Sequence, residues 1–341
     1  MLKANKCVGC GIIKQNKNKN KNEPGYVLDL NHQYCMECFK LMNYGVVKSH
    51  HKLDQYPEVK ENSLILITHS ILQLDLLFTL PVERIQPKAK FVYIINQIDL
   101  LPKETNLDYF YNKIRKKAIE NKVSFSDIVF MSAINENDIN NLKLFINTFN
   151  NKHIYLFGFQ NSGKSTIFKG LTNNESVLTI NKPGLTQDII SEEINNKIIS
   201  DMPGTYNKGY ISDYLNYDQY KNLIPNSIIK PKVYTFNKNQ KLILNNLIEI
   251  SLNSEKDATL IMYISNALKV DRYNILNKRN YLNESFNYVS KTFNLKYTKS
   301  HIQLADIGFI LINDKANITI KYPKNMHITL MESLLRWHMM N

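Results

Sequence analysis

Residues 158–165 read Gly-Phe-Gln-Asn-Ser-Gly-Lys-Ser, which is the G-x-x-x-x-G-K-[ST] pattern of a phosphate-binding loop. The glycines Gly158 and Gly163 let the backbone curl, so that successive N–H groups point toward phosphate oxygens. Lys164 would then reach the β- and γ-phosphates, and the Ser165 hydroxyl would face Mg²⁺. We therefore expect this stretch to bind a nucleoside triphosphate.

The chain around this loop has the required order of strand, loop and helix. An apolar run, residues 153–157, precedes the loop, and a helical stretch begins near Thr166. The N-terminus of a helix adds partial positive charge that favours phosphate. An ordinary strand–turn–helix corner is the alternative. We count Asn161, Ser162 and Thr166 among the nucleotide-binding residues as well.

Two motifs before the loop predict recognition of guanine. Residues 96–99, Asn-Gln-Ile-Asp, match N-x-x-D and follow a predicted strand. The Asp99 carboxylate can accept hydrogen bonds from guanine N1–H and the exocyclic amine, a pair that adenine does not offer. Asn96 belongs to the same base-binding motif. Ser132 and Ala133, at the end of the next strand, would present a backbone N–H to guanine O6.

Two motifs after the loop predict the Mg²⁺ and γ-phosphate contacts. Residues 201–204, Asp-Met-Pro-Gly, match D-x-x-G, so Asp201 would hold Mg²⁺ through water and the Gly204 N–H would face the γ-phosphate. Thr186, from Pro-Gly-Leu-Thr, would be a switch residue on Mg²⁺. Each tetrapeptide alone is a weak signal, but together they predict a GTP site. The expected catalytic residues are Lys164, Thr186, Asp201 and Gly204, and the expected Mg²⁺ ligands are Ser165, Thr186 and Asp201.

An alternation of strands and helices would position these motifs. Short continuous apolar runs are typical of strands that are buried on both faces of a parallel sheet, and they occur at residues 63–68, 90–95, 127–131 and 153–157. Apolar residues recur at helical spacing over residues 107–118 and 138–149, with Asp138 as the expected N-cap of the second helix. This pattern predicts a doubly wound α/β domain.

All four cysteines fall in two C-x-x-C pairs near the start of the chain. They are Cys7 with Cys10, and Cys35 with Cys38. Four thiolates suit tetrahedral Zn²⁺. Disulfide or redox use is the alternative, but nothing in the sequence indicates export to an oxidising compartment. The basic Asn/Lys tract between the pairs, residues 14–22, is expected to be disordered, so metal binding would hold this small segment together.

The composition indicates a globular protein with an anionic partner. The 341 residues suffice for two or three domains, and the net charge is +13. This charge favours a polyanion, although a coding bias toward Asn, Lys, Ile and Tyr is an alternative explanation. No apolar run is long enough to span a bilayer and no signal-peptide pattern is present, so we expect a cytoplasmic protein without a membrane partner.

The last third of the chain predicts a small α+β domain. Expected strands lie at residues 232–236, 241–244, 258–264, 302–312 and 318–322, with a closing helix at 331–339. Residues 266–301 interleave Lys and Arg with Tyr and Phe, which suits RNA phosphates and bases. A solvated basic face over core aromatics is the alternative. We expect a zinc-finger module at 1–50, a GTPase domain at 51–225 and this domain at 226–341.

The order of the motifs is the most specific feature. An ordinary GTPase has its phosphate loop first and its base motif last, whereas here residues 96–99 and 132–133 precede residues 158–165. This order predicts a circularly permuted GTPase. With the cysteine pairs in front and a separate domain behind, residues 7–235 resemble the YqeH-type GTPases of bacterial 30S ribosome assembly. The resemblance implies GTP hydrolysis, with the small ribosomal subunit and its 16S rRNA as partners and ribosomal proteins as further candidates.

Two departures predict weak activity in isolation. Gln97 stands where the family has lysine, which predicts weaker nucleotide affinity. Thr205 and Tyr206 stand where many GTPases place a glutamine that orients water. The resemblance implies that Asn161 helps to hold K⁺ against the phosphates, so we expect slow hydrolysis that K⁺ and an RNA–protein partner raise. A GTP-regulated RNA- or protein-binding scaffold is the alternative, and an ATPase a more distant one. Because residues 201–209 lead directly into the last domain, γ-phosphate contacts are expected to reposition it.

Overall fold

The structure is a computed structural model that describes residues 6–8, 12–16, 25–36, 38–39, 58–80, 82–174, 189–254, 256–296 and 299–336. Its contacts divide the chain into two compact units. The first comprises Met1–Ile71, Leu76–Ile98 and Ala118–Asn207, and the second comprises Leu72–Asp75, Asp99–Lys117 and Lys208–Asn341. The division into domains at 1–50, 51–225 and 226–341 stays a prediction.

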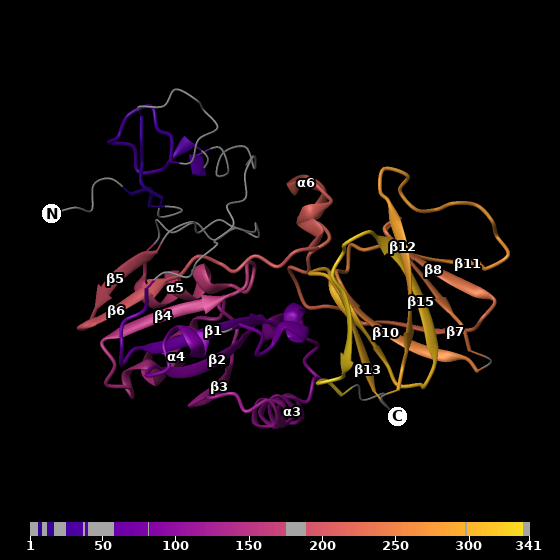
Figure 1. Ribbon diagram of the computed structural model, residues 1–341, viewed down its shortest axis with the longest axis horizontal. Coiled ribbons are helices and arrows are strands. Elements are labelled where there is room, and N and C mark those ends of the chain that lie inside the picture. Colours follow the sequence, from indigo (N-terminus) through magenta and orange to yellow (C-terminus); the bar gives the residue numbers. More distant parts are fainter. Residues whose placement is uncertain are drawn as a thin grey trace. The chain divides into compact units, whose positions relative to one another are not determined.

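The first unit is built on a six-stranded sheet of order β3-β2-β1-β4-β6-β5 (Figure 1). Its strands are β1 (Leu64–Ser70), β2 (Lys90–Asn96), β3 (Asp127–Phe130), β4 (His153–Gly158), β5 (Ile190–Ile194) and β6 (Lys197–Asp201). All neighbours are parallel except β5, which runs antiparallel to β6 at the edge. The sheet is therefore mixed, and the predicted buried strands are confirmed with small shifts at their ends.

Helices complete this part of the chain. They are α2 (Val82–Ile85), α3 (Leu107–Glu120), α4 (Glu136–Asn147) and α5 (Lys164–Thr172), with short 3₁₀ helices at Ile71–Leu76 (η2) and Ile98–Leu100 (η3). One apolar core joins alternate residues of the strands to α4 and α5; it includes Leu66, Ile94, Leu142, Leu156 and Phe168. Those two helices therefore cover one face of the sheet.

The start of α4 differs from the sequence prediction. Its N-cap is Asn135, whose side-chain oxygen accepts hydrogen bonds from the N–H groups of Asn137 and Asp138. Asp138, predicted as the N-cap, lies inside the first turn, and its carboxylate accepts a hydrogen bond from the Ser132 N–H. An asparagine and an aspartate both suit a helix N-terminus, so residue type alone did not separate the two positions.

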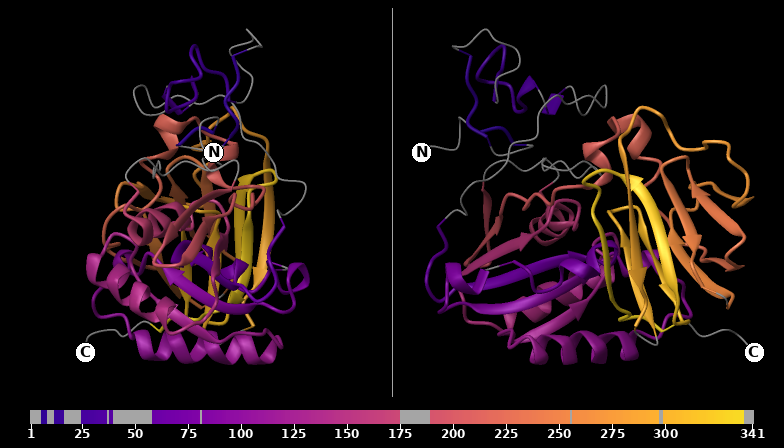
Figure 2. Two further views of the ribbon diagram at one scale, coloured as in Figure 1. Left: turned by 90° about the vertical axis from the view of Figure 1, so that its left-hand side faces the viewer. Right: turned by 45° about the vertical axis from the view of Figure 1, so that its right-hand side comes forward.

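The second unit carries two five-stranded antiparallel sheets, of order β16-β13-β14-β10-β7 and β11-β8-β9-β15-β12, visible from two sides in Figure 2. Their strands are β7 (Lys232–Phe236), β8 (Gln240–Leu244), β9 (Ile248–Leu252), β10 (Ala258–Ile264), β11 (Val270–Asn274), β12 (Tyr288–Asn294), β13 (Ser300–Leu304), β14 (Gly308–Ile312), β15 (Asn317–Pro323) and β16 (Ile328–Glu332). A 3₁₀ helix, η4 (Ile211–Asp213), and a short helix, α6 (Tyr217–Tyr220), precede them.

These sheets correct the prediction of a C-terminal α+β domain. Within the described part of residues 226–341, all regular secondary structure is β-strand. The apolar run 302–312 is two strands joined by a turn at Ala305, which has φ +46°. All three turn residues, Ala305, Asp306 and Ile307, are buried. Asp306 interrupts the apolar run just before Gly308, and this polar residue was the signal for the turn that the prediction of one strand overlooked. The predicted helix 331–339 is wrong at its start, where Met331 lies in β16; residues 337–339 lie outside the described residues.

Within the described residues, no helix combines the length and apolar character needed to cross a membrane.

Candidate nucleotide-binding site

The phosphate loop joins β4 to α5 through a backbone that only glycine can follow. Gly158 has φ +150° and Gly163 has φ +88°. A Cβ atom at Gly158 would lie 2.2 Å from the Thr68 carbonyl oxygen, and one at Gly163 would lie 2.1 Å from Asn96 Nδ2. Both contacts are far shorter than van der Waals distance. The two glycines of the motif are therefore required by close approach as well as by backbone conformation.

Lys164 is enclosed at the first turn of α5. Its residue surface is only 5% exposed, and Nζ donates a hydrogen bond to the Phe159 carbonyl oxygen over 3.2 Å. Burial lowers the pKa of Lys164, and the nearby Asp201 charge opposes that shift. The Ser162 hydroxyl is also buried and has no hydrogen-bond partner among the described residues. A desolvated ammonium and an unsatisfied donor in one loop fit a bound phosphate.

Two of the three predicted Mg²⁺ ligands meet at the end of β6. The Ser165 hydroxyl donates a hydrogen bond to Asp201 Oδ2 over 2.6 Å. A hydroxyl and a carboxylate are the hard oxygen ligands that Mg²⁺ prefers, usually with water and phosphate completing the shell. These two side chains therefore fit the ion that a nucleoside triphosphate carries. Thr186, the third predicted ligand, lies outside the described residues.

The D-x-x-G motif is bonded directly to the phosphate loop. Thr205, the residue after the motif, donates its N–H to the Gly158 carbonyl oxygen and accepts from the Gln160 N–H, each over 3.0 Å. A Cβ atom at Gly204 would lie 3.0 Å from Lys164 Nζ. Gly204 is therefore next to the ammonium that is expected to hold the γ-phosphate, as its predicted role requires.

Asn96 connects three of the predicted motifs. Its Nδ2 donates to the Ser162 carbonyl oxygen, and its Oδ1 accepts from the Ala133 N–H, each over 2.9 Å. Asn96 is fully buried. Its motif predicts base binding, and the bridging role was not predicted, because an asparagine at a strand end is its only local signal. The phosphate loop, Asn96 and Ala133 are thus brought together at the carboxyl ends of the strands.

The contacts to guanine itself stay predictions. The N–H groups of Ser132 and Ala133 both have acceptors within the protein, Asp138 and Asn96 respectively. Asp99 lies in η3, shortly after Asn96. Gln97, which stands in place of a lysine, has φ +66° and accepts a hydrogen bond from the Ser70 hydroxyl. That contact gives Gln97 a local partner at the end of β1.

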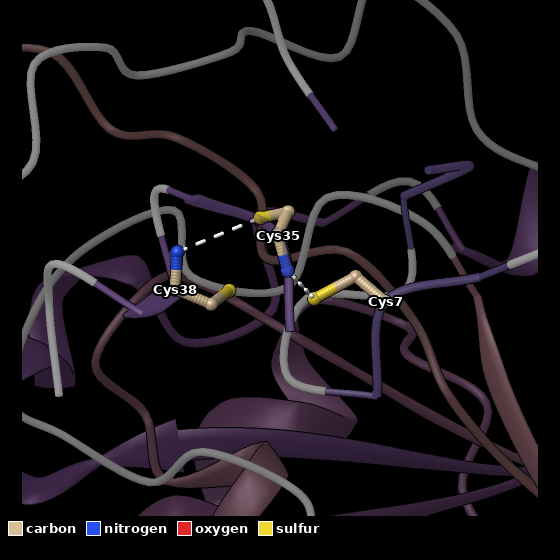
Figure 3. Close-up of side chains that lie close together, drawn as sticks. All are labelled: Cys7, Cys35 and Cys38. Carbon is tan, nitrogen blue, oxygen red and sulfur yellow. Dashed lines mark hydrogen bonds between the residues drawn. The ribbon is translucent and has the colours of Figure 1, made fainter. Parts of the chain in front are cut away.

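Three of the four cysteines form a cluster (Figure 3). The sulfurs of Cys7, Cys35 and Cys38 lie within 4.8 Å of one another, and all three residues are buried and free of disulfides. The Cys35 N–H donates to Cys7 Sγ over 3.1 Å and the Cys38 N–H to Cys35 Sγ over 3.5 Å. Sulfur ligands at about 2.3 Å from Zn²⁺ lie about 3.8 Å apart, so the cluster fits this metal. Cys10 lies outside the described residues.

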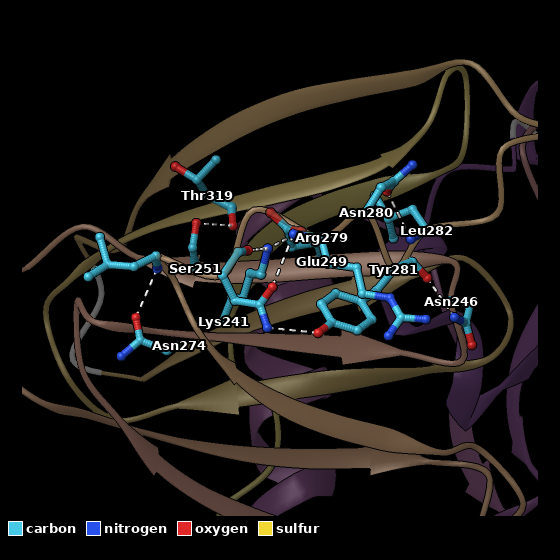
Figure 4. A network of polar contacts seen from close by, with 12 residues as sticks. Lys241, Asn246, Glu249, Ser251, Asn274, Arg279, Asn280, Tyr281, Leu282 and Thr319 are labelled. Carbon is cyan, nitrogen blue, oxygen red and sulfur yellow. Dashed lines mark hydrogen bonds and ion pairs between the residues drawn. The ribbon is translucent and has the colours of Figure 1, made fainter.

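The predicted RNA-contacting stretch lies partly in the sheet that contains β8, β11 and β12. Lys241 and Arg279 both lie near the Tyr281 ring, at 5.8 Å and 5.5 Å from its centroid, as the close-up in Figure 4 illustrates. Tyr273 stacks on Tyr281 with centroids 3.8 Å apart. Phe293, by contrast, is buried. Arg279 is exposed and Tyr281 is half-buried, whereas Lys241, which lies outside the predicted stretch, is buried and forms an ion pair with Glu249. The stretch therefore contains both exposed basic residues and core aromatics, and RNA binding stays a prediction.

Comparisons with known proteins agree with this geometry. Residues 153–278 match the family model described as 50S ribosome-binding GTPase. The chain is also 24% identical, over 368 aligned positions, to the uncharacterized protein YqeH of Bacillus subtilis (strain 168), which covers 96% of this chain and 99% of that protein. The chain therefore contains a P-loop GTPase domain with a mixed sheet, and the matched residues continue past Asn207 into the second unit. Such a domain implies GTP or GDP with Mg²⁺ as its ligands.

Proposed function

We propose that this chain is a circularly permuted GTPase that hydrolyses GTP to GDP and phosphate while bound to a ribosomal particle in the cytoplasm. The observation that carries the proposal is the double hydrogen bond of Asn96 to the Ser162 carbonyl oxygen and the Ala133 N–H. It joins the predicted base-recognition motifs to the phosphate loop at one sheet edge. Nucleotides bind in α/β sheets at such an edge, beyond the carboxyl ends of the strands.

Permutation is supported by where the family match begins. The match starts at residue 153, the first residue of β4, and so includes the phosphate loop and the D-x-x-G motif. Asn96 and Ala133 lie before that point in the chain. In the sheet, however, β2 and β4 are both neighbours of β1. The same sheet edge is therefore assembled from motifs that run in the permuted order.

The experiment that tests guanine recognition changes the group at residue 99 from a hydrogen-bond acceptor to a donor. In the proposal, Asp99 accepts from the guanine exocyclic amine, so Asp99→Asn should reduce GTP affinity. Xanthine carries an oxygen in place of that amine, so the amide of the variant should improve binding of xanthosine triphosphate. Titration of both nucleotides against parent and variant measures this exchange. A parent that binds ATP as tightly as GTP, or a variant with unchanged preference, would contradict the proposal.

The ribosomal partner is tested by co-sedimentation with isolated subunits. The sequence resemblance favours the 30S subunit and its 16S rRNA, whereas the matching family description names 50S. We expect GTP-dependent binding to 30S, with a steep decline as salt rises because the net charge is +13. Binding to 50S subunits alone would transfer the proposal to the large subunit, and binding to neither would contradict it.

Turnover distinguishes the proposed enzyme from a GTP-regulated scaffold that hydrolyses almost nothing. We expect slow hydrolysis that rises with 30S subunits and in K⁺ buffer compared with Na⁺ buffer. Asn161, which has φ +62° in the loop, is the proposed K⁺ contact. Equal rates for Asn161→Ser and the parent in K⁺ would remove that contact from the proposal.

Zn²⁺ held by Cys7, Cys10, Cys35 and Cys38 would give the N-terminal segment its fold.

A further inference from the structure

The chain that follows the D-x-x-G motif is attached to the second unit at Gly209. This residue has φ +90°, and a Cβ atom there would lie 2.4 Å from the Asn325 carbonyl oxygen and 2.7 Å from the His327 nitrogen. The two backbones approach too closely for a side chain. The His327 N–H donates to the Gly209 carbonyl oxygen over 2.9 Å. The turn between β15 and β16 therefore holds the chain at this point.

Two carboxylates strengthen the same attachment. The Gly209 N–H donates to Asp213 Oδ2, and the Ile211 N–H donates to Asp306 Oδ1, each over 2.8 Å. Ile211 is fully buried and Asp306 is 2% exposed. Because a buried N–H without an acceptor is costly, this stretch has little freedom to leave its position. Residues 209–213 are thus a fixed point shortly after Gly204.

The side chain of His327 makes a second attachment. Its Nε2 lies 2.6 Å from Asp75 Oδ2, and the Thr329 hydroxyl donates to the same oxygen over 2.7 Å. Burial raises the pKa of Asp75, but the hydrogen bonds from His327 and Thr329 outweigh it, so the net direction is downward and the carboxylate stays charged. Gln303 Nε2 also donates to the Leu72 carbonyl oxygen over 2.7 Å. The segment Leu72–Asp75, which follows β1, is therefore held in the same unit.

His327 thus holds two segments at once, one through its backbone and one through its imidazole. These segments continue from β1 and β6, the two strands that flank β4 and its phosphate loop. We propose that His327 is a positioning residue that couples the chain after D-x-x-G to the chain after β1, and so lowers the cost of ordering Gly204 against the γ-phosphate. This inference rests on the proposed GTPase function.

The test compares the affinities of GTP and GDP, because only GTP offers the γ-phosphate. In the full-length protein, His327→Ala keeps the backbone bond to Gly209 but removes the bond to Asp75. We expect the Kd for GTP to rise about tenfold, as for the loss of one charge-assisted hydrogen bond. The Kd for GDP should stay within about twofold. His327→Gln, whose amide can still donate to Asp75, should recover most of the preference for GTP.

A matched control separates positioning from stability. Thr329→Val removes the other hydrogen bond to Asp75 without touching the Gly209 attachment. It should therefore lower the melting temperature while leaving the ratio of GTP affinity to GDP affinity unchanged. If His327→Ala does not fold, Asp75→Asn removes the charge of the partner carboxylate instead. This variant should reduce the ratio of GTP affinity to GDP affinity about threefold, because a hydrogen bond between neutral groups is weaker. Equal effects on GTP and GDP, or none, would overturn the inference. A parent that binds no GTP would instead overturn the proposed function.

Discussion

Replacement of Asn96 by aspartate is the most direct perturbation of the candidate site. Asn96→Asp keeps the size of the side chain and the oxygen that accepts from the Ala133 N–H. It replaces the Nδ2 donor by an oxygen that faces the Ser162 carbonyl oxygen, at the position where the parent has a 2.9 Å hydrogen bond. The substitution therefore removes one bond to the phosphate loop and leaves a buried carbonyl without its donor.

The expected cost is that of a buried carbonyl oxygen left without its donor. Such an unsatisfied acceptor costs about 1–3 kcal/mol. This cost corresponds to an increase of about 5-fold to 140-fold in the Kd for GTP if it falls entirely on binding. Any part that falls on folding will appear as a lower melting temperature of the nucleotide-free protein, so both quantities must be measured together.

The introduced carboxylate also predicts a dependence on pH. Burial beside a carbonyl oxygen raises the pKa of a carboxyl group, and its protonated form can donate to the Ser162 carbonyl oxygen again. Affinity of Asn96→Asp for GTP should therefore recover as the pH falls, whereas that of Asn96→Ala should not. Titrations with a fluorescent GTP analogue between pH 5 and 8 measure this difference. If Asn96→Asp binds GTP like the parent and melts at the same temperature, the bridging role of Asn96 is wrong.

Three further predictions concern separate parts of the chain. Gly163→Ala should weaken GTP binding more than tenfold, because its Cβ would lie 2.1 Å from Asn96 Nδ2, and isothermal titration against the parent checks this loss. Cys35→Ser should reduce bound Zn²⁺ below one per chain by elemental analysis, and full occupancy would argue against this ligand. Burial raises the pKa of Asp306 from 3.8 to about 6, so its stabilising contribution is complete below pH 3.8 and is lost as the pH rises through about 6. Asp306→Asn should therefore gain up to about 3 kcal/mol relative to the parent between pH 4 and 7 in denaturant titrations, and a difference that does not change with pH would contradict the buried charge.

The motifs and the buried strands were predictable because each depends on neighbouring residues. The apolar runs of β1, β2 and β4 and the residue types of the phosphate loop are local signals. The polar strands were not predictable in this way. In β11, Val-Asp-Arg-Tyr-Asn has no buried residue and three of its five residues are half-buried, so no apolar pattern marks it. The closing helix was expected where the chain continues as β16, since pairing with β13 decides that structure and pairing is not local.

The functional contacts that were missed join residues that are distant in the chain. Asn96 reaches Ser162 and Ala133, and no local pattern reports such a bridge. Asp75 and His327 each resemble an ordinary surface residue in the sequence. Their role follows only from the turn that brings β15 and β16 together and from the segment that follows β1. Spacing identifies residue types that suit a reaction, whereas the partners that hold them require the folded chain.

The division of the second unit among three stretches of chain has a consequence for its synthesis. Leu72–Asp75 and Asp99–Lys117 belong to it, but most of the unit begins at Lys208. During translation the early stretches emerge long before the strands that hold them. Asp75 cannot form its bond until His327, 252 positions later, has been synthesised. Such long-range contacts slow folding. A fragment that begins at Lys208 would leave His327 and Gln303 without these partners, so we expect it to be less soluble than the complete chain.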